Sequence, residues 1–144
     1  MKEDYCSYEL SKLLKEKGFD ELTNLVWYQH LPTSLDCRNL VNKKARDYFY
    51  HNETTEHNSS YKNSRHKPEY IHGDIFSCPT HQMAMKWLRE VHNIHIAVDR
   101  GMEHYFAVLT KLKPYQDLTM KNDIFDTYEE AVEAALRYCL TKII

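Results

Sequence analysis

The sequence predicts an α+β fold, an antiparallel sheet of β-hairpins packed with about three helices in the order α-ββ-α-ββ-α. Apolar residues at helical spacing occupy three segments, strict apolar alternation occupies a fourth, and β-forming residues are concentrated in a fifth. A sheet covered by helices buries the apolar faces of such elements. The helical spacing occurs in 7–17, 79–93 and 127–144. The apolar alternation lies in 94–112, and the β-forming residues are concentrated in 22–31.

The first predicted helix runs from residue 7 to residue 17. Leu10, Leu13 and Leu14 share one side of it, and charged residues surround them. Gly18 followed by Phe19 predicts a Schellman ending, in which the glycine is left-handed and the apolar residue folds back on the helix.

The second predicted helix has Pro79 in its first turn, where the missing N–H leaves no hydrogen bond unmade. Asn93 is expected to end this helix in the left-handed conformation. Its buried stripe follows the i, i+3, i+4, i+7 spacing of one helix face. The stripe consists of Ala84, Trp87, Leu88 and Val91.

A hairpin is expected after this helix. Ile94, Ile96 and Val98 alternate along one face of its first strand. A turn through Asp99-Arg100-Gly101 then leads to a second strand over about 105–112.

The third predicted helix begins with a capping box. The Thr127 side chain caps the helix, and Glu130 reaches back to the backbone of Thr127. An apolar stripe continues from there toward residue 144. Its members are Tyr128, Val132, Ala135, Leu136, Cys139, Leu140 and Ile143.

The N-terminal half predicts strands that are less sharply marked. Residues 22–31 are rich in strand formers and stop at Pro32, 45–50 is a second strand, and 36–41 is another short one. Residues 51–69 are almost entirely polar and predict a loop insertion. Three side chains of this loop suit contact with a partner, namely Tyr61, Arg65 and His66.

Composition narrows the class of protein. A chain of 144 residues, 42% hydrophobic and 28% charged, can bury a core without disulfides, so we expect one domain over 1–144. The net charge of −2 is evenly spread and disfavours nucleic acid. No apolar run approaches the ~20 residues of a membrane span. Four widely separated cysteines without an export signal predict reduced thiols in the cytoplasm.

Three stretches resemble a family of short uncharacterised proteins of bacteriophages and mobile elements of gut anaerobes. They are CSYELSKLLKEKGFD (6–20), CPTHQMAMKWLREVHNIHIAV (78–98) and TYEEAVEAALRYCLTKII (127–144). The resemblance implies an αββα-type sandwich and carries over no catalytic residue. The 51–69 loop departs from the family pattern.

Residues 72–81 hold the best candidates for chemistry. Cys78 and His81 have the spacing of a zinc ligand pair, which His72 or Asp74 could complete, but no second ligand pair is present. Cys78 at a helix N-terminus could also serve as a thiolate nucleophile with a histidine base. The alternative is structural, with a thiol near the helix cap and one exposed imidazole. Of the other cysteines, Cys139 is assigned to the core, and Cys6 and Cys37 have no readable partner.

A surface around the second hairpin is the other candidate. His95 lies opposite the apolar face of its strand and should point away from the core, and His92, His104 and Tyr105 lie near it in sequence. Imidazole and aromatic rings suit binding of a base or a partner. A solvated sheet face is the competing interpretation.

No catalytic set is complete, so a non-enzymatic binding protein of a phage or mobile element is favoured. Its expected partner is a host protein or a small nucleotide-like ligand held between protomers, which implies a homo-oligomer. No cofactor is expected. The first alternative is a metal- or cysteine-dependent hydrolase using Cys78 with His81 or His72, and the second is a DNA-binding regulator.

Overall fold

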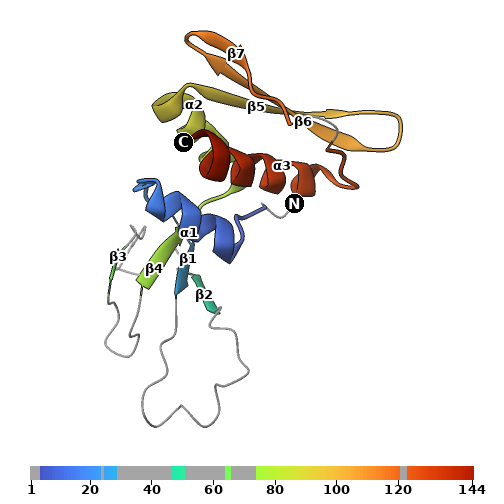
Figure 1. The fold of residues 1–144 in the computed structure, drawn as a ribbon. Coiled ribbons are helices and arrows are strands. Elements are labelled where there is room, and N and C mark those ends of the chain that lie inside the picture. The colour runs from blue at the N-terminus through green and yellow to red at the C-terminus, as the bar shows by residue number, and fades with distance from the viewer. Residues whose placement is uncertain (1–3, 24, 29–46, 51–63, 66–73, 121–122) are drawn as a thin grey trace.

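The computed structural model describes residues 4–23, 25–28, 47–50, 64–65, 74–120 and 123–144. An α+β fold is confirmed, with three helices and a three-stranded antiparallel sheet (Figure 1). A second, four-stranded sheet accompanies them. In chain order the elements are α1 (Tyr8–Glu16), β1 (Leu25–Tyr28), β2 (Asp47–Tyr50), β3 (Ser64–Arg65), β4 (Asp74–Cys78), α2 (His81–His92), β5 (Ile94–Arg100), β6 (Tyr105–Leu112), β7 (Tyr115–Asp117), α3 (Tyr128–Tyr138) and the π-helical turn η1 (Cys139–Ile143).

The three-stranded sheet has the order β5-β6-β7. The predicted hairpin is confirmed as β5 and β6, whose register pairs Ile96 with Leu109 and Ala97 with Val108. Strand β7 was not predicted from the sequence. All three of its residues are exposed, so it lacks the apolar alternation by which a strand is recognised.

The four-stranded sheet has the order β2-β1-β4-β3, with every pairing antiparallel. Strands predicted within 22–31 and 45–50 are confirmed as β1 and β2. Strand β4, which pairs with both β1 and β3, was not predicted from the sequence. The strand predicted at 36–41 lies outside the described residues, as does most of the 51–69 segment.

The helices lie between the two sheets (Figure 1). Helices α2 and α3 pack against the β5-β6-β7 sheet, whereas α1 contacts α3 on one side and β4 on the other. Apolar side chains from all three helices and from β5 and β6 form one core. Its largest fully buried members include Leu10, Leu14, Phe19, Leu88, Ile94, Leu109, Leu136 and Leu140.

The predicted helix ends are confirmed where local sequence determines them. Gly18 has φ +90°, and Phe19 N–H donates to the Leu14 carbonyl as a Schellman ending requires. Asn93 ends α2 with φ 57°. Thr127 and Glu130 form both hydrogen bonds of the capping box, each 3.2 Å long.

Two details of α2 differ from the prediction. The helix begins at His81 with Thr80 as its N-cap, so Pro79 precedes the first turn instead of occupying it. Val91 is 56% exposed although its spacing places it on the buried stripe. It lies in the last turn, past the part of the helix that the core covers.

Candidate functional site

A groove of about 930 Å³ opens beside α3. One wall is the segment that precedes α1, another is α3 with η1, and residues 120 and 125 belong to a third. Apolar surface predominates in the lining, with a few polar groups among it. The lining residues are Asp4, Tyr5, Cys6, Ser7, Trp27, Cys78, His81, Met120, Phe125, Glu129, Glu130, Glu133, Ala134, Arg137, Tyr138, Thr141 and Lys142.

Backbone pairing brings the starts of α1 and α2 together at this groove. Tyr5 and Thr80 form an isolated antiparallel bridge. Cys6 N–H donates to the Pro79 carbonyl, and His81 N–H donates to the Asp4 carbonyl, both at 2.9 Å. The side chains of Ser7 and His81 therefore emerge next to each other.

Glu133 of α3 reaches both of these side chains. His81 Nε2 lies 2.8 Å from Glu133 Oε2, while Ser7 donates to Oε1 through its hydroxyl and through its backbone N–H, the latter at 3.3 Å. The Ser7 hydroxyl oxygen also accepts from Leu10 N–H at 3.2 Å as the N-cap of α1. One carboxylate thus lies at the N-termini of two helices, where the helix dipoles favour negative charge.

The surroundings keep Glu133 ionised. Burial raises the pKa of its carboxyl group, but the hydrogen bonds from His81 and Ser7 outweigh burial and lower the pKa below its ordinary value. An ionised carboxylate only accepts hydrogen bonds, so Nε2 of His81 carries the proton. Nδ1 of His81 is buried and has no hydrogen-bond partner among the residues that the structure describes.

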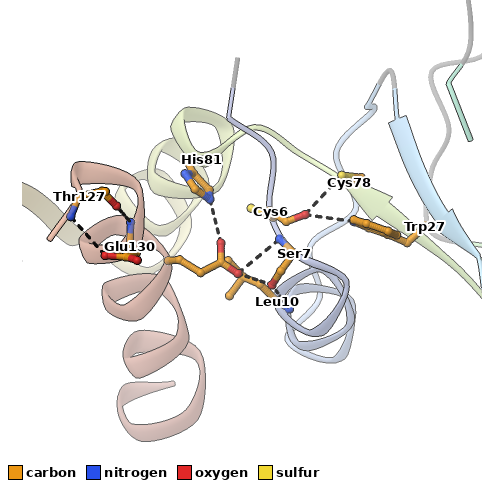
Figure 2. A network of polar contacts seen from close by, with 9 residues as sticks. Cys6, Ser7, Leu10, Trp27, Cys78, His81, Thr127 and Glu130 are labelled. Carbon is orange, nitrogen blue, oxygen red and sulfur yellow. Dashed lines mark hydrogen bonds and ion pairs between the residues drawn. The ribbon is translucent and has the colours of Figure 1, made fainter. Parts of the chain in front are cut away.

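Cys78 also lines the groove. Its thiol donates to the Cys6 carbonyl oxygen at 3.5 Å, and the indole N–H of Trp27 donates to the same oxygen at 3.1 Å (Figure 2). Burial is the largest cause that raises the pKa of Cys78 to about 12. Burial likewise raises the pKa of Cys6 well above its ordinary value. Both thiols are therefore protonated at neutral pH, which disfavours the alternative in which Cys78 acts as a thiolate nucleophile.

Cys78 and His81, the predicted zinc pair, both line the groove but bond to different partners. Within the described part of the chain, no group of three or more His, Cys, Asp or Glu residues could hold a metal ion. His72 lies outside that part, and of Asp74 only the backbone is described. The interpretation of His81 as an exposed imidazole is wrong, because its side chain is only 8% exposed and bonds to the half-buried Glu133.

His95 and Tyr105, two of the four residues predicted for a surface around the hairpin, lie on opposite faces of the sheet. His95 is half-buried and pairs with Thr110, opposite the face that carries Ile94 and Ile96. Tyr105 pairs with Arg100 and shares the helix-facing side with the buried Ala107. The ring of Tyr105 makes an edge contact with Tyr128 at 6.4 Å between centroids.

The remaining predicted residues are dispersed. His92 packs edge-on against Trp87 at 4.7 Å between ring centroids, and His104 Nδ1 lies 3.9 Å from Asp126. Cys139 is fully buried, as predicted. Tyr61, His66 and Cys37 lie outside the described residues, and Arg65 is described only as backbone in β3.

Sequence reasoning missed Glu133, Ser7 and Trp27 as members of one site. Glu133 follows Glu129 and Glu130 in the same helix. The sequence alone therefore does not distinguish it from a solvent-exposed acidic residue on a helix. Ser7 carries a usable signal, because serine ahead of a helical stripe predicts an N-cap. Its bond to Glu133, 126 residues away, leaves no local pattern.

No protein family, curated protein or solved structure matches this chain. Among the described helices, none combines the length and apolar character needed to cross a bilayer. The groove is therefore interpreted from its own geometry.

Proposed function

We propose that the protein is a non-enzymatic binding protein that holds a small ligand in the groove beside α3. The observation that carries the proposal is a groove of about 930 Å³, lined mainly by apolar surface around one hydrogen-bonded polar cluster. Ligand sites in proteins have this character and volumes of about 300–1,000 Å³. We propose in addition, as an expectation from the sequence alone, that this binding serves a phage or mobile element.

The arrangement of Ser7, Glu133 and His81 supports binding over hydrolysis. In a serine hydrolase the imidazole lies between the hydroxyl and the carboxylate and takes the hydroxyl proton. Here the carboxylate lies between the hydroxyl and the imidazole. The Ser7 hydroxyl also caps α1, so its hydrogen bonds are those of a structural residue.

The hydrolase alternative receives less support from Cys78. A cysteine nucleophile needs a lowered thiol pKa and a base within hydrogen-bond reach. The pKa of Cys78 is raised to about 12, and its thiol donates to a backbone carbonyl.

Binding can be tested with three probes of one shape: 3-phenylpropylamine, 3-phenylpropan-1-ol and 3-phenylpropanoate. Trp27 lines the groove, and its indole N–H, bonded to the Cys6 carbonyl oxygen, gives an NMR signal that a bound probe should shift. We expect saturable shifts with at least one of the three probes. If none of them causes a saturable shift, the proposal is wrong.

Two tryptophan substitutions locate the binding. Ala134→Trp fills the groove, because Ala134 lines it, and should abolish the saturable shifts. Val91→Trp adds the same side chain at an exposed position on α2 and should leave them unchanged. Equal binding by both variants would place the probe elsewhere and contradict the proposal.

A further inference from the structure

We propose that the groove selects organic cations, that is, ligands with an ammonium group on an apolar or aromatic body. This inference rests on the proposed binding function and names the class of ligand. It depends on three features of the groove: its charge, an unused hydrogen-bond acceptor position on its half-buried carboxylate, and its aromatic lining.

Negative charge predominates around the groove. The acidic residues Asp4, Glu129, Glu130 and Glu133 line it, against the basic residues Arg137 and Lys142. All of these are exposed except Glu133, which is half-buried. The charge closest to the interior is therefore a carboxylate, and it is the charge that solvent screens least.

Glu133 has one acceptor position left for a ligand. A carboxylate offers about four lone-pair positions. Among the described residues, Oε1 accepts twice from Ser7 and Oε2 accepts once from His81. Because 23% of the Glu133 side chain is exposed, a ligand in the groove can reach the remaining position on Oε2.

The remaining position accepts a hydrogen bond and bears negative charge. An alkylammonium group has three donors, no acceptor and a positive charge, so it satisfies both requirements. A carboxylate or phosphate has no donor to offer and would be repelled. A neutral hydroxyl could donate but would gain no charge assistance.

The apolar part of the ligand would contact aromatic side chains. Tyr5, Trp27, Phe125 and Tyr138 line the groove. Aromatic rings attract cations as well as apolar groups, and aromatic side chains are a common means of binding organic ammonium ions. The lining thus favours the same class of ligand as Glu133.

Affinities of the three isosteric probes, measured by NMR titration, test the inference. We expect 3-phenylpropylamine to bind about tenfold tighter than 3-phenylpropan-1-ol, in line with a hydrogen bond to a charged group, and 3-phenylpropanoate to bind weakest. Raising the salt concentration should weaken binding of the amine and leave the alcohol unchanged.

Glu133→Gln keeps the shape of the side chain and removes its charge. It should lower the affinity for the amine about tenfold and change the affinity for the alcohol less than about twofold. Glu103→Gln makes the same change at an exposed residue outside the groove and should affect neither probe. Should Glu133→Gln fail to fold, Glu129→Gln at the exposed edge of the groove replaces it, with a smaller selective loss of amine affinity.

The outcomes separate this inference from the proposed function. If the alcohol binds in the groove and the amine binds no tighter, the proposed binding function holds but the inference that the groove selects cations is wrong. If the propanoate binds more tightly than the amine, the positive charges of Arg137 and Lys142 determine which ligand binds, and the inference is overturned. If no probe binds, both proposals are overturned.

Discussion

Nε2 of His81 lies 2.8 Å from Oε2 of Glu133, so the first residue of α2 is bonded to a carboxylate in the middle of α3. The other oxygen of the same carboxylate bonds Ser7 at the N-cap of α1. A single side chain thus joins all three helices of the fold. The stability of the helical layer and the charge of the groove both depend on Glu133.

Replacing Glu133 with glutamine is expected to destabilise the protein at neutral pH. The variant keeps a carbonyl acceptor but loses the charge-assisted bonds to Ser7 and His81, which should lower the free energy of unfolding by about 1–3 kcal/mol. Urea unfolding followed by circular dichroism measures the difference. Glu103→Gln, at an exposed residue, should change the free energy of unfolding by less than about 0.5 kcal/mol.

The difference between wild type and Glu133→Gln should depend on pH. The pKa of Glu133 is lower in the folded state than its ordinary value of 4.5, so the carboxylate stabilises the fold above pH 4.5. That contribution is lost as the pH falls through the folded-state pKa. Unfolding at pH 7 and pH 3 should show a smaller difference at the acid pH, and an equal difference at both would contradict the assignment.

Ser7→Ala should cost more than the loss of an ordinary helix cap. Ser7 caps α1 and also bonds Glu133, whereas Thr127 caps α3 in an exposed capping box. We expect Thr127→Ala to cost about 1 kcal/mol and Ser7→Ala about 2 kcal/mol. In a double-mutant cycle, Ser7→Ala and Glu133→Gln should be non-additive, and strict additivity would show that the two side chains do not interact.

Two substitutions in α2 test the extent of its buried stripe. Leu88 is fully buried, so Leu88→Ala should lower the free energy of unfolding by about 2–5 kcal/mol. Val91 is 56% exposed, and Val91→Ala should cost less than about 0.5 kcal/mol. If urea unfolding shows similar losses of unfolding free energy for the two variants, the last turn of α2 is buried and the assignment of Val91 as exposed is wrong.

Alkylation rates test the state of the cysteines. Burial raises the pKa of both Cys78 and Cys139 to about 12, so little thiolate forms at pH 8. In the folded protein, iodoacetamide should modify each at least about a hundredfold more slowly than in the urea-unfolded chain. Mass spectrometry of the peptides identifies the sites, and fast labelling of Cys78 would favour the hydrolase alternative.

The parts of the fold that sequence predicts well are those that neighbouring residues determine. Gly18 with Phe19 specifies the end of α1, and Thr127 with Glu130 specifies the start of α3. Each pattern needs only a few adjacent residues, because the hydrogen bonds close within one helical turn. The apolar stripe of α2 was predicted equally well until its last turn, where burial depends on what other elements cover.

The site was not predictable because its residues come from distant parts of the chain. Glu133 resembles a solvated helix residue until the fold places Ser7 and His81 beside it. The faces of His95 and Tyr105 depend on the register between β5 and β6, since a shift of one residue exchanges the two faces. Strand β4 is hard to predict because one neighbour in the sheet, β1, is distant in the sequence and the other, β3, lies within the polar 51–69 segment.

The bond between Ser7 and Glu133 spans 126 residues, which bears on how the chain folds during synthesis. Helix α1 leaves the ribosome before α3, so a partner of its N-cap is made only when α3 is translated. Until then Leu10 and Leu14 lack much of the apolar surface that buries them in the finished fold. Helix α1 should therefore remain accessible to proteases and chaperones in the nascent chain until α3 emerges.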